Sequence, residues 1–217
     1  MNFEPLLIRH FGLVDYQTAF DAMRRFTESR GPDTPDEIWL LQHPPVFTQG
    51  MNGKPEHLLA PGEIPVVAVD RGGQVTYHGP GQLVVYLLLD LRRRGVGVRQ
   101  VVSAMEQAVI ELLRDYDLQS EARQDAPGVY VHGNKVASLG LRVRRNGSYH
   151  GLSLNVEMDL EPFSRINPCG HRGLGVTQLR ALGIDDSLQT VAQKLLEQLA
   201  EQLGIAAWQQ APAALPA

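Results

Sequence analysis

The chain has one cysteine, no long apolar run and no excess of positive charge. A single cysteine among 217 residues excludes an internal disulfide and is typical of a reducing compartment. No segment approaches the roughly 18 consecutive apolar residues that a transmembrane helix requires, and the N-terminal sequence lacks the regions of a secretory signal. The net charge of −4 argues against nucleic-acid binding. These absences predict a soluble, cytoplasmic protein with no nucleic-acid or membrane partner.

The rest of the composition, with 43% hydrophobic and 20% charged residues, is ordinary for a globular domain. Apolar residues recur with helical period in three segments, with Asp15 and Ser187 as N-caps of the first and third and Gly204 as the stop of the third. These segments are 15–31, 98–116 and 187–204. Apolar runs predict strands at 37–42, 64–70, 82–91, 128–133, 135–145 and 149–158. The order predicts an α/β (α+β) fold, a mixed sheet with helices packed on it.

Two features of the ends and turns complete this prediction. Asn146 and Gly147 separate the last two strands and favour a type I′ hairpin turn, because both residue types tolerate positive φ. The segment 209–217, QQAPAALPA, has no periodic pattern and is predicted to be unstructured.

The single cysteine, Cys169, lies in the stretch INPCGHRG, between a proline and a glycine. Free cysteines are usually buried as small hydrophobic residues, whereas Pro and Gly favour a turn that presents a side chain. His171 follows two residues on, but one cysteine without paired spacing is weak evidence for a metal site. The residues leave two interpretations open, a nucleophilic thiol and an inert one.

At three other positions the sequence alone does not decide whether the polar side chains are functional or structural. The stretch 71–90 holds Arg71, Thr76, Tyr77 and His78 between glycine-rich turns. This pattern is compatible with a ligand-binding loop and slightly more with a hairpin that has glycine-rich corners. Lys135 opens an apolar strand, where a lysine is normally a solvated edge residue, and the alternative is a lysine drawn into a cleft. His43, before two prolines, is predicted to be structural.

Five stretches taken together resemble the lipoyl(octanoyl)transferase family. They are HPPVFTQG, RGGQVTYHGPGQLVVY, NKVASLGLRV, HGLSLNV and INPCG, in the family's order across residues 43–170. The resemblance implies the fold of the biotin/lipoate protein ligase catalytic domain, which is a mixed sheet with a smaller second sheet and flanking helices. It implies a single catalytic domain over residues 1–207, with the ligase-like core at about 32–207 and a flexible tail at 208–217.

The resemblance also implies an activity. Octanoyl would pass from octanoyl-acyl carrier protein, with lipoyl-acyl carrier protein as a further donor, to a lysine of lipoyl domains. The acceptors would be oxoacid dehydrogenase complexes and the glycine cleavage H protein. Cys169 would be the acyl-thioester nucleophile, and Lys135 would make the thiol more acidic and act as acid and base. No cofactor or metal is implied. The substrate-binding residues would be Arg71, Gly72, Gly73, Gln74, Val75, Thr76, Tyr77, His78, Ser138, Leu139, Gly140, Gly151, Leu152 and Ser153.

Two other functions fit the same fold. An ATP-dependent lipoate-protein ligase would share a lysine like Lys135 but would have no use for Cys169, and a non-catalytic acyl-carrier binding protein would need neither residue. Two arginine clusters, Arg142/Arg144/Arg145 and Arg92/Arg93/Arg94, are candidates for contact with an acidic carrier protein, although a solvated basic face is about as common.

Overall fold

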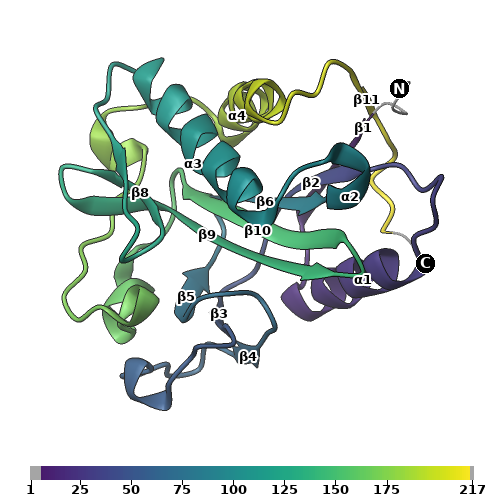
Figure 1. The fold of residues 1–217 in the computed structure, drawn as a ribbon. Coiled ribbons are helices and arrows are strands. Elements are labelled where there is room, and N and C mark those ends of the chain that lie inside the picture. Colours follow the sequence, from purple (N-terminus) through teal and green to yellow (C-terminus); the bar gives the residue numbers. More distant parts are fainter. Residues whose placement is uncertain (1–5, 216–217) are drawn as a thin grey trace.

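The computed structural model describes residues 6–215, which form two sheets, four α-helices and short 3-10 turns (Figure 1). The helices are α1 (Tyr16–Ser29), α2 (Leu91–Arg94), α3 (Val98–Arg114) and α4 (Leu188–Gln202). The strands are β1 (Leu6–Leu13), β2 (Glu37–Gln42), β3 (Val46–Gln49), β4 (Val66–Ala68), β5 (Val75–His78), β6 (Gln82–Leu88), β7 (Glu121–Ala122), β8 (Gly128–Val131), β9 (Asn134–Arg144), β10 (Gly147–Asn155) and β11 (Trp208–Gln210).

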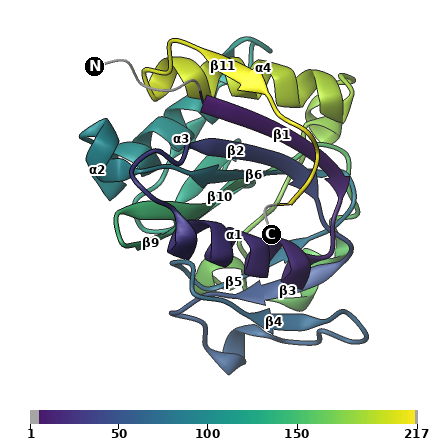
Figure 2. The ribbon, with the colours of Figure 1, turned by 90° about the vertical axis from the view of Figure 1, so that its right-hand side faces the viewer.

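The large sheet has the order β11-β1-β2-β6-β10-β9-β8-β7, and the small sheet the order β4-β3-β5. In the large sheet β1 runs parallel to β2 and β11, whereas the other neighbours are antiparallel. This arrangement confirms the predicted mixed sheet with a smaller second sheet. In Figure 2 β1 and β11 form one edge of the large sheet.

The two faces of the large sheet are covered differently (Figure 1). Helices α3 and α4 pack on one face and bury a core of aliphatic side chains from β2, β6, β9 and β10. Helix α1 packs on the other face through Phe20, Met23 and Phe26, against the aromatic side chains of Trp39 and Tyr149. The small sheet lies on this second face, beside α1, and has its own apolar cluster. The second face is therefore covered partly by α1 and partly by the small sheet, and the candidate site lies on this face.

The predicted helices form with the expected N-caps. The Asp15 carboxylate accepts the backbone N–H of Thr18, and the Ser187 hydroxyl accepts that of Thr190, which satisfies donors that a helix start leaves free. Gly204, with φ of +63°, follows the end of α4 as predicted. These starts and stops depend on local chemistry, and for that reason the sequence predicts them well.

The hairpin between β9 and β10 turns one residue earlier than predicted. Gly147 pairs with Arg144, so the two turn residues are Arg145 and Asn146, with φ of +50° and +69°. The positive φ angles are those of the expected turn type. Gly147 instead begins β10, where a Cβ would lie 2.9 Å from the side chain of Thr27. Close packing against α1 fixes the register.

The predicted unstructured tail is wrong at its start. Trp208–Gln210 form β11, which extends the large sheet as a parallel neighbour of β1. Beyond it, Arg9 donates to the carbonyl of Pro212 at 2.8 Å. Without β11, β1 would be the edge strand and would leave backbone N–H and C=O groups unpaired. The 208–210 segment forms hydrogen bonds with these groups. Residues 216 and 217 of the predicted tail lie outside the described part of the chain.

The cluster Arg92/Arg93/Arg94 is largely occupied within the fold. Asp36, which is buried, accepts from Arg93 at 2.7 Å and from Arg94 at 2.5 Å, and Arg30 completes the group at 2.6 Å. Two of the three arginines thus neutralise an internal carboxylate. This cluster is therefore not the free basic surface considered above. Within residues 6–215 no helix is long and apolar enough to cross a membrane.

Candidate active site

Cys169 lies in one 3-10 turn, Pro168–Gly170, and is partly exposed. Its backbone is left-handed, with φ of +54°, and Gly170 follows at +80°. This region is uncommon for a residue other than glycine, and such residues gather at functional sites. The N–H of Asn167 donates to the His57 carbonyl at 2.9 Å, which ties the turn to a neighbouring segment. The thiol is therefore presented by a constrained turn.

Lys135 reaches the same place from the start of β9. Its N–H donates to the Gly175 carbonyl at 2.8 Å, and its carbonyl accepts the N–H of Thr177 at 2.9 Å, so the chain that follows the cysteine runs beside it. The Lys135 Nζ lies 2.8 Å from the Cys169 Sγ. Lysine and thiol thus form a hydrogen-bonded pair, although 34 residues separate them in the chain.

The surroundings of Lys135 are those of a cleft and not of a solvated edge. The residue is 2% exposed. Its Nζ also donates to the Pro127 carbonyl at 3.0 Å and lies 5.3 Å from the centre of the Tyr130 ring. Gly128 leaves room for it, since a Cβ there would lie 2.8 Å from the lysine Cε. The Lys135 amine therefore faces the thiol from a buried position.

A cavity of about 50 Å³ lies beside the thiol, between β5, β6, β9 and β10. Strands β9 and β10 place two predicted segments opposite each other, because Ser138 pairs with Ser153 and Gly140 with Gly151. The lining residues are Tyr16, Arg71, Gly73, Gln74, Val75, Thr76, His78, Val84, Tyr86, Ser138, Leu139, Gly140, His150, Gly151, Leu152, Ser153 and Cys169. The structure therefore gathers twelve of the fourteen predicted substrate-binding residues around one cavity.

The two exceptions are Gly72 and Tyr77. Because side chains alternate along a strand, Tyr77 points away from Thr76 and His78, and its ring packs 5.5 Å from those of Phe47 and Phe163. Gly72 contributes backbone contacts, donating its N–H to the Leu141 carbonyl at 3.1 Å. These two residues do not line the cavity, and their predicted role in substrate binding stays a prediction.

Arg71 places a buried cation at this cavity. Its Nη2 donates to the carbonyl and to the hydroxyl of Thr48, both at 2.8 Å, and its Nη1 donates to the Gly72 carbonyl at 3.0 Å. These partners are neutral oxygen atoms. Burial lowers the pKa of Arg71, and negative charge on Tyr16 or Cys169 opposes that shift. The guanidinium thus contributes positive potential near the thiol.

A network of buried histidines and tyrosines supports the cavity. The His43 Nδ1 donates to the Val14 carbonyl at 2.7 Å, so its Nε2 accepts from the Tyr86 hydroxyl, also at 2.7 Å. Burial lowers the pKa of His43 to about 4 and raises that of Tyr16 to about 12. His43 is therefore neutral and structural, as predicted. His78 donates from Nδ1 to Gln82 at 2.7 Å, and burial lowers its pKa as well.

Four lining residues were not predicted as site residues: Tyr16, Val84, Tyr86 and His150. Tyr16 and the strand residues Val84 and Tyr86 were predicted only as parts of buried elements. His150 stands directly before the predicted segment Gly151–Ser153, within the stretch HGLSLNV, so its position carried a usable signal.

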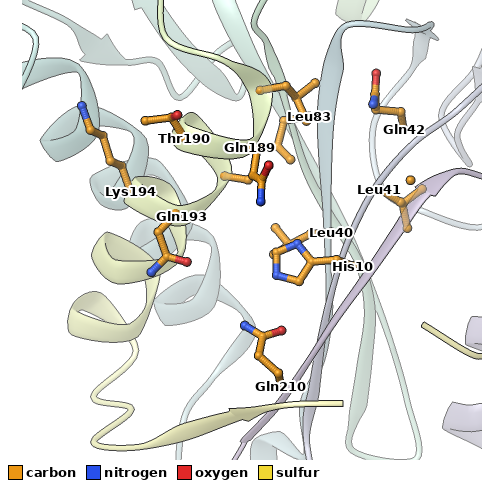
Figure 3. Close-up of a pocket in the computed structure, with 13 residues that line it drawn as sticks. His10, Leu40, Leu41, Gln42, Leu83, Gln189, Thr190, Gln193, Lys194 and Gln210 are labelled. Carbon is orange, nitrogen blue, oxygen red and sulfur yellow. The ribbon is translucent and has the colours of Figure 1, made fainter. Parts of the chain in front are cut away.

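A larger cavity, of about 850 Å³, lies between α4 and the strands β1, β2 and β11. Figure 3 shows amide side chains around it, among them Gln42, Gln189 and Gln210. It contains neither the thiol nor any predicted site residue. Residues 6–215 also contain no group of three or more His, Cys, Asp or Glu residues arranged to hold a metal ion.

A family model described as "Lipoyl protein ligase A/B catalytic domain" matches residues 15–200. The chain belongs to this family. It is 63% identical over 199 residues to an octanoyltransferase of Stutzerimonas stutzeri, with 92% of this chain and 91% of the relative covered. It is also 63% identical over 201 residues to an octanoyltransferase of Azotobacter vinelandii, with 92% of each covered. These relatives confirm the predicted family and the class of acyltransferase.

Solved structures show the same fold at low identity. Lipoate-protein ligase A bound with ATP has a TM-score of 0.76 at 16% identity, with 98% of this chain and 90% of that chain covered. Biotin protein ligase from Aquifex aeolicus has a TM-score of 0.55 at 14% identity, with 94% and 70% covered. The predicted biotin/lipoate ligase-like fold is therefore confirmed.

Proposed function

We propose that this chain transfers an octanoyl group from octanoyl-acyl carrier protein to a lysine of lipoyl domains, through a thioester on Cys169. The observation that carries this proposal is the 2.8 Å contact between the Lys135 Nζ and the Cys169 Sγ. The cysteine lies in a turn and lines the cavity. The name of the relatives supplies the acyl group.

In the first half-reaction the Cys169 thiolate attacks the carbonyl carbon of the donor thioester. A new C–S bond forms, the old one breaks, and the carrier's thiolate leaves and takes a proton. One thioester replaces another, so the step is close to isoenergetic. The donor is already activated, which is why this chemistry requires neither ATP nor a cofactor. Arg71 and Lys135 supply the positive charge that stabilises the anionic species.

In the second half-reaction the acceptor lysine, as a free amine, attacks the thioester carbon. The C–N bond forms, the bond to Cys169 breaks, and the amine must lose a proton. Lys135, having given its own proton to the carrier's departing thiolate, is then a neutral amine beside the thioester sulfur, and it accepts this proton. The product amide is much more stable than the thioester.

The cavity lined by Arg71–His78, Ser138–Gly140 and Gly151–Ser153, apart from Gly72 and Tyr77, is the proposed acyl-binding pocket. An octanoyl chain offers about six methylenes, and burial at about 0.8 kcal/mol each stabilises the complex by roughly 5 kcal/mol.

The proposed acceptors are lipoyl domains of oxoacid dehydrogenase complexes and the glycine cleavage H protein. In support, an archaeal ligase with the same fold was studied together with its E2 lipoyl domain, and has a TM-score of 0.70 at 16% identity, with 98% and 88% covered. Four further expectations stay predictions. They are lipoyl-acyl carrier protein as a second donor, a single domain over 1–207, a cytoplasmic location, and steering of the carrier protein by Arg142, Arg144 and Arg145.

The deciding experiment incubates the protein with octanoyl-acyl carrier protein alone. Intact mass should show one octanoyl group, hydroxylamine should release it, and a subsequently added apo lipoyl domain should take it. Cys169→Ala should show neither adduct nor turnover. Full turnover by Cys169→Ala would refute the thioester. Formation of octanoyl-adenylate from octanoate and ATP would favour a ligase, and carrier binding without turnover would favour a binding protein.

A further inference from the structure

His150 breaks the alternation of β10 at the inner wall of the cavity. Its neighbour Tyr149 packs in the core under α1, so a regular strand would turn the histidine to the opposite face. The His150 φ of +61° turns it back, and its ring stacks on Phe20 of α1 at 5.4 Å. A left-handed backbone at a residue other than glycine is costly and is typical of functional positions.

Hydrogen bonds determine which nitrogen of His150 carries the proton. The Asp70 carboxylate lies 3.1 Å from Nε2 and also accepts the hydroxyl of Tyr149. Burial raises the pKa of Asp70, but these two hydrogen bonds outweigh it and lower the pKa to about 2. An ionised carboxylate only accepts, so Nε2 donates. Burial lowers the pKa of His150, which is therefore neutral and leaves Nδ1 as an acceptor.

This acceptor has no partner among residues 6–215, although it is buried. Buried polar atoms are nearly always hydrogen-bonded, and each exception calls for an explanation. His150 lines the same cavity as Cys169. A residue with an unsatisfied acceptor therefore lines the proposed acyl-binding pocket, and an alkyl chain alone offers no donor to it.

The position of His150 along the ladder gives its distance from the thiol. Gly128 pairs with Ser138 of β9, and a Cβ at Gly128 would lie 3.1 Å from the Lys135 Nζ, so this amine and the thiol that it contacts lie level with Ser138. His150 pairs with Leu141, three residues after Ser138. Three residues of strand span about 10 Å. An extended octanoyl chain reaches about 9 Å from its carbonyl carbon, given C–C bonds of about 1.5 Å. His150 thus lies where the last carbons of such a chain would end.

We infer that His150 forms a subsite for a hydrogen-bond donor on the far end of the acyl chain, so that the pocket also accepts medium-length chains with a terminal hydroxyl or thiol. This inference rests on the proposed function. The Nδ1 lone pair accepts from the O–H or S–H, and Asp70 keeps the imidazole in the tautomer that can do so. The subsite adds a substrate class to octanoyl and leaves the transfer chemistry unchanged.

The experiment compares three donors on the same carrier protein: octanoyl, 8-hydroxyoctanoyl and 3-hydroxyoctanoyl. In the wild type, kcat/KM for 8-hydroxyoctanoyl should stay within about 10-fold of octanoyl, because the buried hydroxyl regains a hydrogen bond. In His150→Phe, which keeps an aromatic ring against Phe20, the ratio of 8-hydroxyoctanoyl to octanoyl should fall by about 10-fold or more. The ratio for 3-hydroxyoctanoyl should not change, since its hydroxyl lies near the carbonyl.

Tyr149→Phe is the matched control. It removes the other partner of Asp70 without removing a cavity-lining group, so the ratio should stay within about 2-fold. If His150→Phe does not fold, the wild-type acyl-enzyme gives a second measurement, because the ¹⁵N resonance of the His150 Nδ1 should shift with 8-hydroxyoctanoyl and not with octanoyl.

Two outcomes would overturn the subsite: rejection of 8-hydroxyoctanoyl by more than about 100-fold in the wild type, or an unchanged ratio in His150→Phe. If octanoyl itself is not transferred, the proposed function fails instead.

Discussion

The protein should lose stability in mild acid because His43 is buried as a neutral residue. Its Nδ1 proton is donated to the Val14 carbonyl, and its Nε2 accepts from Tyr86. Protonation would place a second proton on Nε2, opposite a hydroxyl that already donates. It would also bury a charge in a residue that is 0% exposed. The unfolded chain takes up this proton freely, so acid favours unfolding.

The size of the effect follows from the pKa of His43, which burial lowers from 6.5 to about 4. A depressed histidine pKa contributes stability that is complete above the unfolded value and is lost as the pH falls toward the folded value. At about 1.4 kcal/mol per pKa unit, this residue alone costs roughly 2 kcal/mol by pH 5 and roughly 3 kcal/mol by pH 4. His78 and His150, whose pKa values burial also lowers, add to the slope with the same sign.

The assay is urea unfolding between pH 8 and pH 4. The free energy of unfolding of the wild type should fall steeply below pH 6.5. Between pH 8 and pH 5, His43→Asn should lose roughly 2 kcal/mol less of this free energy than the wild type does. Its lower stability at pH 8 does not affect this comparison. His132→Asn, which replaces an exposed histidine in a left-handed conformation that asparagine tolerates, should keep the wild-type slope. Equal slopes for wild type and His43→Asn would refute the reasoning.

Three further predictions concern other parts of the fold. Asp36→Asn should cost about 3–5 kcal/mol in urea unfolding, because it leaves the surrounding arginines without their buried anion; a loss below about 1 kcal/mol would contradict this account. Gly151→Ala should cost at least about 1–3 kcal/mol, since its Cβ would overlap the Val85 carbonyl oxygen; wild-type stability would show that β6 shifts without strain. Lys135→Arg should acylate Cys169 and then stall, because guanidinium does not release a proton at neutral pH; intact mass should show a persistent adduct, and wild-type turnover would exclude Lys135 as the proton acceptor.

Helices and their caps were predictable because the relevant residues are close in sequence. The Asp15 and Ser187 caps each act over three residues. The strand β1 was missed because its segment, LLIRHFGL, mixes apolar residues with Arg9 and His10, and its pairing with β2 and β11 depends on distant parts of the chain. β11 was assigned to the unstructured tail for the same reason. The strand β3 is short and directly follows two prolines, which favoured a turn. The glycine-rich stretch that holds β5 favoured a hairpin, whereas β5 pairs with β3 in the small sheet and lies in a different sheet from β6.

The resemblance to a family supplied the site residues, and physical patterns alone would have misplaced one of them. A lysine at the start of a strand is normally solvated, yet Lys135 is buried against a ring, a carbonyl and a thiol. Its burial depends on Gly128 and on the chain after Cys169, and neither lies next to it in sequence. The arginines at 92–94 are the opposite case. Their sequence pattern is typical of an exposed basic surface, yet Arg93 and Arg94 form ion pairs with the buried Asp36.

The backbone framework that holds Lys135 and Cys169 does not depend on their side chains. Lys135 is fixed by backbone hydrogen bonds to Gly175 and Thr177, and the cysteine turn by the bond from Asn167 to His57. None of these contacts uses the ammonium or the thiol. Side-chain substitutions at Lys135 and Cys169 should therefore change the chemistry while the turn and the strand keep their positions. Loss of activity in such variants can then be read as loss of a chemical step, provided that their unfolding curves match the wild type.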